Sequence, residues 1–226
     1  MTQGAPRQAK IGIGQFFATP IAQIELPDMD ALNAELAELF LAREGEADKF
    51  RNPHRYTTQF GELFESRFDL FHWPDPPVQR LASIIHHVLT NFVREINRYG
   101  EEDMQRLTFH YHSWFHVTRR GGYQTLHDHA MASWSGIYYV HPGDSLPGHP
   151  ESGVVRFYDP RGFSPMYIDG ANRQLDPRFA FAALPVIPQA GRMLLFPSWL
   201  AHEILPYQGE KERIVVAFNS WAEERR

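Results

Sequence analysis

The stretch Gly122–Val140, GYQTLHDHAMASWSGIYYV, is apolar and rich in aromatic residues, and it carries two histidines, His127 and His129, separated by one residue. Successive side chains of a β-strand point to opposite faces. If Tyr123 to His129 forms a strand, both imidazoles therefore point the same way and Asp128 points the opposite way. Imidazoles suit iron, zinc, copper and nickel, so the stretch predicts two ligands of one transition-metal site.

A third ligand is expected far downstream, in the segment FPSWLAHEILP. There His202 follows a hydrophobic strand and a turn, and eleven residues later Arg213 opens the strand-like run RIVVAFN. A guanidinium can hold a carboxylate through two parallel hydrogen bonds. This order of elements predicts a metal site inside a β-barrel, with an arginine placed to hold an anionic co-substrate.

The segments SWFHV, HDH, SWSGIYYV, FPSWLAH and RIVVAFN, taken in order, resemble the iron(II)- and 2-oxoglutarate-dependent oxygenases of double-stranded β-helix fold, in particular a bacterial and phage branch of that superfamily. The resemblance extends to the N-terminal QFFATPIAQIELPD. His127 matches the first metal ligand, His202 matches the distal ligand, and Arg213 matches the residue that binds the far carboxylate of 2-oxoglutarate. The resemblance implies Fe(II), 2-oxoglutarate and O2 as cofactors of a hydroxylase.

Two positions depart from the pattern of that superfamily. His129 stands where a carboxylate is usual, and Val215 stands where the serine of an Arg-x-Ser pair would be. Strand parity favours His129 over Asp128, so we predict a three-histidine metal site, unless a bulge rotates the strand and lets Asp128 ligate. Three neutral imidazoles leave Fe(II) its full double charge, which should tighten binding of an anionic keto acid.

The run TFHYHSWFHVT, residues 108–118, predicts a strand with two different faces. His110, His112, Trp114, His116 and Thr118 share one face, and apolar residues that should pack on helices form the other. The resembled enzymes often bind 2-oxoglutarate from this strand, so His116 and Thr118 are candidate co-substrate residues. His110 and His112 are interpreted as hydrogen-bonded or surface residues.

Asn219 shares the predicted face of Arg213 on the last strand. It is a further candidate for the co-substrate cavity, with a buried structural hydrogen bond as the alternative.

The N-terminal part of the chain reads as helical. Residues 28–44 place leucines at helical spacing, and residues 78–99 follow Pro76-Pro77 with a long apolar stripe. Between them, residues 45–75 are aromatic and irregular, which predicts either a lid or a wrap around the core. Met1–Lys10 is expected to be a loose tail, and Ile11–Leu26 to contain a strand.

From residue 107 onward the chain consists of short β runs separated by Gly and Pro, without intervening helices. About eight such strands predict a jelly roll. The expected fold is mainly β with N-terminal helices: a double-stranded β-helix (a jelly-roll, cupin-like barrel) packed against two long helices. We expect one domain over residues 1–226, with a helical and loop part at 1–106 and a jelly-roll core at 107–226.

Composition excludes several classes of protein. The 226 residues are 43% hydrophobic, enough for one core, and a net charge of −5 without a long basic run argues against nucleic-acid binding. The absence of cysteine excludes disulfides and thiolate ligands. No signal peptide and no membrane span are visible. We expect a cytoplasmic protein that acts on a small-molecule or peptide substrate, and composition leaves its oligomeric state open.

Two other interpretations remain open. One is a cupin-like metal-dependent dioxygenase or isomerase that does not use 2-oxoglutarate, since cupins share the jelly roll. Against it stand the lack of a glutamate soon after HDH and the match of Arg213. The other is a non-catalytic binding module with a relic site. Fold class cannot identify the substrate.

Overall fold

The computed structural model of the chain describes residues 17–144, 146–162, 167–179 and 183–225. The expected tail Met1–Lys10 and the first part of the expected strand Ile11–Leu26 lie outside these residues. No helix in the described part of the chain combines the length and the apolar composition that crossing a membrane requires.

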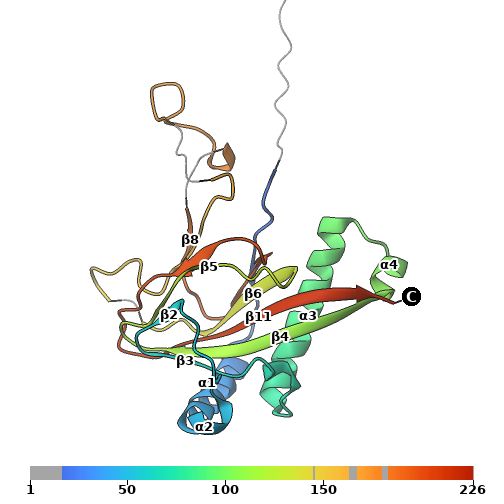
Figure 1. Ribbon diagram of the computed structural model, residues 1–226, viewed down its shortest axis with the longest axis vertical. Coiled ribbons are helices and arrows are strands. Elements are labelled where there is room, and N and C mark those ends of the chain that lie inside the picture. Colours follow the sequence, from blue (N-terminus) through green and yellow to red (C-terminus); the bar gives the residue numbers. More distant parts are fainter. Residues whose placement is uncertain (1–16, 145, 163–166, 180–182, 226) are drawn as a thin grey trace, which may run out of the picture.

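Two antiparallel sheets form the body of the protein (Figure 1). The larger has the order β1-β9-β6-β11-β4-β3 and the smaller the order β2-β5-β10-β7-β8. The predicted mainly β architecture is therefore confirmed. The strands are β1 (Ala22–Glu25), β2 (Gln59–Phe60), β3 (Leu63–Glu65), β4 (Leu107–Thr118), β5 (Tyr123–His127), β6 (Trp134–His141), β7 (Val155–Phe157), β8 (Leu184–Val186), β9 (Arg192–Pro197), β10 (His202–Ile204) and β11 (Arg213–Glu224).

One strand is shorter than the sequence predicts. The strand expected over residues 123–129 is β5, which ends at His127. The chain leaves the hydrogen-bonded ladder there, earlier than the apolar pattern suggests. Between β7 and β8, the described residues 167–179 project away from the sheets (Figure 1).

The helices α1 (Asp30–Gly45) and α3 (Pro76–Asn97) pack on one face of the larger sheet. The other helical elements are α2 (Ala47–Phe50), α4 (Glu101–Gln105) and the 3-10 turns η1 (Leu70–His72) and η2 (Pro177–Phe179). Proline is favoured in the first turn, where α3 begins, and α3 ends where Arg98 adopts a left-handed conformation with φ 57°. Its buried stripe, at helical spacing, consists of Val78, Leu81, Ile85, Leu89 and Val93.

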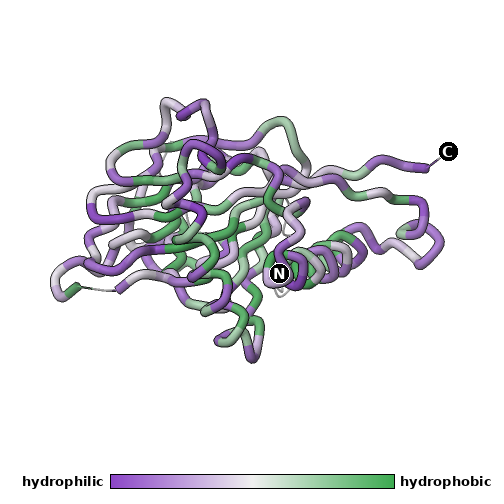
Figure 2. The backbone as a smooth tube through the Cα atoms, turned by 90° about the horizontal axis from the view of Figure 1, so that it is seen from below, coloured by the Kyte–Doolittle hydropathy of each residue, from purple (hydrophilic) through white to green (hydrophobic). Residues whose placement is uncertain are grey.

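The long strands β4 and β11 pair along their whole length and form the centre of the larger sheet. Strand alternation sends Phe115 and Val117 into the core under the helices, where Phe115 stacks on Phe40 of α1 at 4.3 Å. The neighbouring positions Trp114 and His116 point into the space between the sheets. Figure 2 shows hydrophobic residues concentrated within the sheets and hydrophilic ones in the outer loops and at the C-terminal end.

The segment of residues 45–75 differs from the irregular loop that was expected. It contributes β2 to the edge of the smaller sheet and β3 to the edge of the larger. Gln59 pairs with Gln124 of β5, and Glu65 pairs with His116 of β4. The segment therefore wraps the sheets, as one of the two interpretations held, and brings its own side chains to the space between them.

Candidate metal and co-substrate site

Three histidines converge at one end of the space between the sheets. The ligand nitrogens of His127, His129 and His202 all lie within 4.8 Å of one another, and they form the one such group of His, Cys, Asp or Glu in the described part of the chain. The ring centroids of His127 and His202 are 4.4 Å apart, and that of His129 lies 5.2 and 5.3 Å from them.

Sheet register brings the distal histidine to the first one. His202 of β10 lies directly opposite His127 of β5 in an antiparallel pair, and opposite residues share a face with Cβ atoms about 5 Å apart. A ligand far along the sequence thus arrives by strand pairing.

His129 reaches the group by a turn rather than by strand alternation. Because β5 ends at His127, the chain is free to bend, and the backbone N–H of His129 donates to the carbonyl of Ser198 at 2.8 Å. Asp128 is exposed, and its carboxylate accepts from the backbone N–H of Ala130 at 3.3 Å. The expected parity therefore holds for a different reason: the structure brings His129 to the other two histidines and leaves Asp128 outside.

Two of the imidazoles have their tautomer fixed by backbone carbonyls. His127 Nδ1 lies 2.7 Å from the carbonyl of Thr125, and His202 Nδ1 lies 2.9 Å from that of Leu200. A carbonyl only accepts, so each Nδ1 carries the hydrogen and each Nε2 keeps its lone pair. Both Nε2 atoms are therefore in the form that binds a metal.

Burial keeps the three rings neutral. It lowers the pKa of His127, lowers that of His202 well below its usual range, and, together with the neighbouring His127, lowers the pKa of His129 to about 4. Metal binding needs the neutral imidazole, so at neutral pH none of the three rings has to lose a positive charge before a metal binds.

A buried cation lies further into the cavity. Arg213 is 2% exposed, and its Nε and Nη2 have no hydrogen-bond partner among the described residues. Its guanidinium carbon is 5.4 Å from the ring centroid of Tyr139, whose buried hydroxyl also lacks a partner there. Burial lowers the pKa of Arg213 and raises that of Tyr139. Buried charges are normally paired, so these groups form a site complementary to an anion.

His116 belongs to a buried polar network. Its Nε2 lies 2.8 Å from Glu65, which also accepts from Asn52 at 2.8 Å and from Gln59 at 2.6 Å. Burial would raise the pKa of Glu65, but the hydrogen bond and charge of His116, with the two amides, hold it below the ordinary value. Trp114 Nε1 lies 3.1 Å from the same His116 nitrogen. Because the ionised Glu65 can only accept, the hydrogen on His116 Nε2 points to Glu65. Trp114 is then a close neighbour of His116 and not the donor to that nitrogen.

The predicted site residues do not all meet. The cavity between the sheets is lined by the three histidines together with Arg213, His116, Asn219, Gln124, Ile137, Phe196 and Val215, among others. Thr118, a predicted co-substrate residue, is buried directly opposite Arg213 in β4 but does not line the cavity. A direct contact of Thr118 with the co-substrate stays a prediction. Asn219 lines the cavity and also contacts His129 and Ser135.

Sequence inspection missed Glu65 and Tyr139. Nothing in FGELFESRF distinguishes Glu65 from Glu62, and only the pairing of β3 with β4 places Glu65 against His116. Tyr139 does carry a signal: it shares strand parity with Ile137, on the face of β6 that looks into the cavity.

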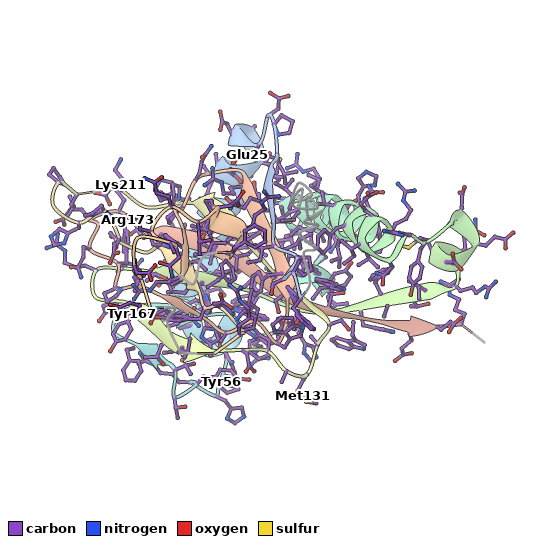
Figure 3. The ribbon with its side chains drawn as sticks, turned by 90° about the horizontal axis from the view of Figure 1, so that it is seen from above. Glu25, Tyr56, Met131, Tyr167, Arg173 and Lys211 are labelled. Carbon is purple, nitrogen blue, oxygen red and sulfur yellow. The ribbon has the colours of Figure 1, made fainter. Side chains whose placement is uncertain are left out.

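An aromatic shelf continues from the histidines along the outer ends of β4 and β11. We use this name for Phe68, His110, His112, Trp114 and Trp221. Trp114 lies 6.1 Å from His129 and 4.8 Å from Phe68, and Trp221 lies 4.9 Å from His112 and 5.6 Å from His110 (ring centroids). Nearby, Tyr56 and Met131 are exposed and project from the same side of the molecule in Figure 3.

Residues 112–219 match a family model described as "Putative 2OG-Fe(II) oxygenase". Similar solved structures include a prolyl-4-hydroxylase from Pseudomonas putida (18% identity over 92% of this chain and 94% of that chain, TM-score 0.59). Another is a prolyl hydroxylase from Trichoplax adhaerens, in complex with a hypoxia inducible factor peptide fragment (13% identity over 92% of this chain and 86% of that chain, TM-score 0.61). A third is HygX from Streptomyces hygroscopicus with nickel and 2-oxoglutarate bound (16% identity over 90% of this chain and 83% of that chain, TM-score 0.57). No curated protein matches the sequence.

At these low sequence identities the solved structures establish only the fold, and the family model is what indicates the oxygenase activity. Its match contains all three clustered histidines and Arg213, which favours the oxygenase interpretation over a cupin-like enzyme that does not use 2-oxoglutarate. The family match supports a 2-oxoglutarate- and Fe(II)-dependent oxygenase, with Fe(II), 2-oxoglutarate and O2 as its cofactors.

Proposed function

We propose that this oxygenase is a hydroxylase that holds Fe(II) with His127, His129 and His202 and anchors 2-oxoglutarate with Arg213. The carrying observation is that neutral imidazoles converge at one end of a cavity whose other end holds a buried guanidinium, two nitrogens of which have no hydrogen-bond partner in the described part of the chain. When bound, Fe(II) would supply the oxidising chemistry in which 2-oxoglutarate and O2 yield succinate, CO2 and an oxidised substrate. We infer that the two facing sheets are the double-stranded β-helix of the superfamily.

The rest of the co-substrate grip comes from the neighbours of Val215. Val215 replaces the serine of the usual Arg-x-Ser pair, and it lies directly opposite His116 on one side and Tyr139 on the other. The free hydroxyl of Tyr139 can donate to the carboxylate that Arg213 binds. His116, held at Nε2 by Glu65, can turn Nδ1 toward the same space. The two adjacent strands thus replace the missing serine.

The aromatic shelf is the surface on which we place the substrate. It begins at Trp114, beside the histidines, and runs outward along two paired strands. Small-molecule sites are usually enclosed and bury most of their ligand, whereas an aromatic strip on extended strands suits an extended peptide. Among the similar structures, the Trichoplax adhaerens enzyme is in complex with a peptide. We therefore favour a peptide over a small molecule as the substrate.

The first test is metal binding and co-substrate turnover. Protein purified without oxygen should bind one Fe(II) and release succinate from 2-oxoglutarate. His127→Ala and His202→Ala should lose the ion because each removes a ligand from an open site. His87→Ala, on the exposed side of α3, is the matched control. Full iron occupancy in both ligand variants would contradict the proposed site, and absence of succinate release by iron-loaded protein would contradict the proposed activity.

A further inference from the structure

The outer nitrogens of the three imidazoles have different kinds of partner. His127 and His202 each face a backbone carbonyl two residues earlier in the chain. His129 Nδ1 instead lies 3.2 Å from the side-chain amide of Asn219. A carbonyl can only accept, but an amide can either donate or accept. The tautomer of His129 is therefore the one that a side chain can change.

The two ends of the Asn219 amide have the same shape, so both of its orientations fit the same space. In the orientation found, Nδ2 faces His129 and Oδ1 accepts from Ser135 Oγ at 2.7 Å. The amide then donates to His129 Nδ1, which puts the ring hydrogen on Nε2, where no metal can bind. Turning the amide over lets Oδ1 accept from Nδ1–H and leaves Nε2 free for the metal.

Two buried serines make the turn possible without losing a hydrogen bond. Ser135 Oγ lies 2.8 Å from Ser198 Oγ, and either hydroxyl can be the donor. Before the turn, Ser135 donates to Asn219; after it, Ser135 accepts from Asn219 Nδ2 and donates to Ser198. The same Ser198 accepts the backbone N–H of His129 through its carbonyl. The chain His129–Asn219–Ser135–Ser198 can thus run in two directions.

We propose that Asn219 is a positioning residue that selects the tautomer of His129, and that metal binding reverses this hydrogen-bond chain. The inference rests on the proposed three-histidine site and assigns a role to Asn219 other than contact with the co-substrate. The proposed role of Asn219 also explains how a histidine can act as a ligand at a position where the superfamily usually has a carboxylate. A carboxylate ligand has no tautomer, whereas an imidazole needs an acceptor at its outer nitrogen.

Metal affinity in three proteins tests the role of Asn219. The dissociation constant of Co(II), measured anaerobically by its visible absorption, should rise about 10- to 100-fold in Asn219→Leu, the usual cost of losing such a partner. Asn219→Asp should stay within about threefold of the wild type, because a carboxylate accepts from Nδ1–H and from Ser135 without any turn. Equal weakening in both variants would mean that Asn219 only fills space.

The tautomer itself can be observed through histidine ¹⁵N chemical shifts. In the wild type, His129 should carry its hydrogen on Nε2 without metal and on Nδ1 with Zn(II), whereas His127 and His202 keep Nδ1–H throughout. In Asn219→Asp, His129 should already carry Nδ1–H without metal. A metal-free wild type with Nδ1–H on His129 would overturn the proposed reversal.

Asn33, a buried asparagine on the other face of the larger sheet, provides the matched control. Asn33 accepts from the hydroxyl of Tyr138 at 2.6 Å on the helix side of the larger sheet. Asn33→Leu should lower stability and leave Co(II) affinity unchanged. If the wild type and His127→Ala bind Co(II) equally, the three-histidine site itself is wrong. If only His127→Ala loses the ion and Asn219→Leu does not, the site stands and the role of Asn219 is wrong.

Discussion

The two faces of the larger sheet are built from the same strands, but one face buries apolar side chains and the other buries charged ones. On the helix side, Phe115 of β4 packs between Phe40 and Phe64, at 4.3 and 5.4 Å, in a dry apolar core. On the other side, the adjacent residue His116 is bound to a buried carboxylate, and Arg213 is buried with two guanidinium nitrogens that have no hydrogen-bond partner among the described residues. One face gains stability from burial, whereas the other buries charge at a cost that a bound anion can offset.

The largest effect is expected on the helix side. Phe115→Ala should destabilise the protein by about 3–5 kcal/mol, because it removes a fully buried ring and leaves a cavity. Denaturant unfolding measures the change. The folded fraction should still bind Fe(II) with normal affinity, since the ring lies on the face away from the histidines. A change in metal affinity as large as the change in stability would show that the two faces are not independent.

The opposite pattern is expected for Arg213. Arg213→Met should raise the concentration of 2-oxoglutarate needed for succinate release by removing a charge-assisted contact worth about 2–5 kcal/mol when desolvated. Stability should stay equal or rise, because the substitution removes a buried cation that has no partner among the described residues. Calorimetric unfolding without 2-oxoglutarate and a titration with it separate the two effects. A large loss of stability would make Arg213 a structural residue.

A smaller effect, on both stability and 2-oxoglutarate binding, is expected at Glu65. Glu65→Gln should cost about 1–3 kcal/mol, because the new amide N–H cannot accept from the donors Asn52, Gln59 and His116. It should also weaken 2-oxoglutarate binding by loosening His116.

The difference in stability between the wild type and Glu65→Gln should depend on pH in a defined direction. The pKa of Glu65 is held below its ordinary value of 4.5 in the folded protein. The unfolded chain therefore takes up this proton first, and the contribution of Glu65 to stability is present above pH 4.5 and lost as pH falls through the folded value. Unfolding curves of wild type and Glu65→Gln should converge below pH 4.5. A constant gap down to pH 3 would contradict the assignment.

The smallest effect is expected at the outer end of the sheet. Trp221→Ala should change stability by about 1 kcal/mol or less, because this ring is only partly buried, on the aromatic shelf. Iron binding and succinate release without substrate should be unchanged. What should fall is the stimulation of succinate release by peptide pools, since the shelf is the proposed substrate surface. Undiminished stimulation would place the substrate elsewhere.

Much of the site was predictable because strand alternation is a local rule. It placed His127 and Arg213 on cavity faces and assigned Phe115 and Val117 to the helix side, as the structure has them. The rule also favoured His129 over Asp128, although the strand ends at His127 and a turn, not alternation, brings His129 inward. A local pattern can thus indicate the correct face without describing the backbone that produces it.

The sequence by itself determined the mainly β class, the three histidines and the arginine, because residue type and a period of two are properties of neighbouring residues. Only the tertiary structure decided which groups face those side chains. Glu65 meets His116 through the pairing of β3 with β4, and Tyr139 meets Arg213 through the pairing of β6 with β11. Asn219, Ser135 and Ser198 meet because β11, β6 and the end of β9 are adjacent. Hydrogen bonds and burial depend on these distant pairings, and no local pattern contains them.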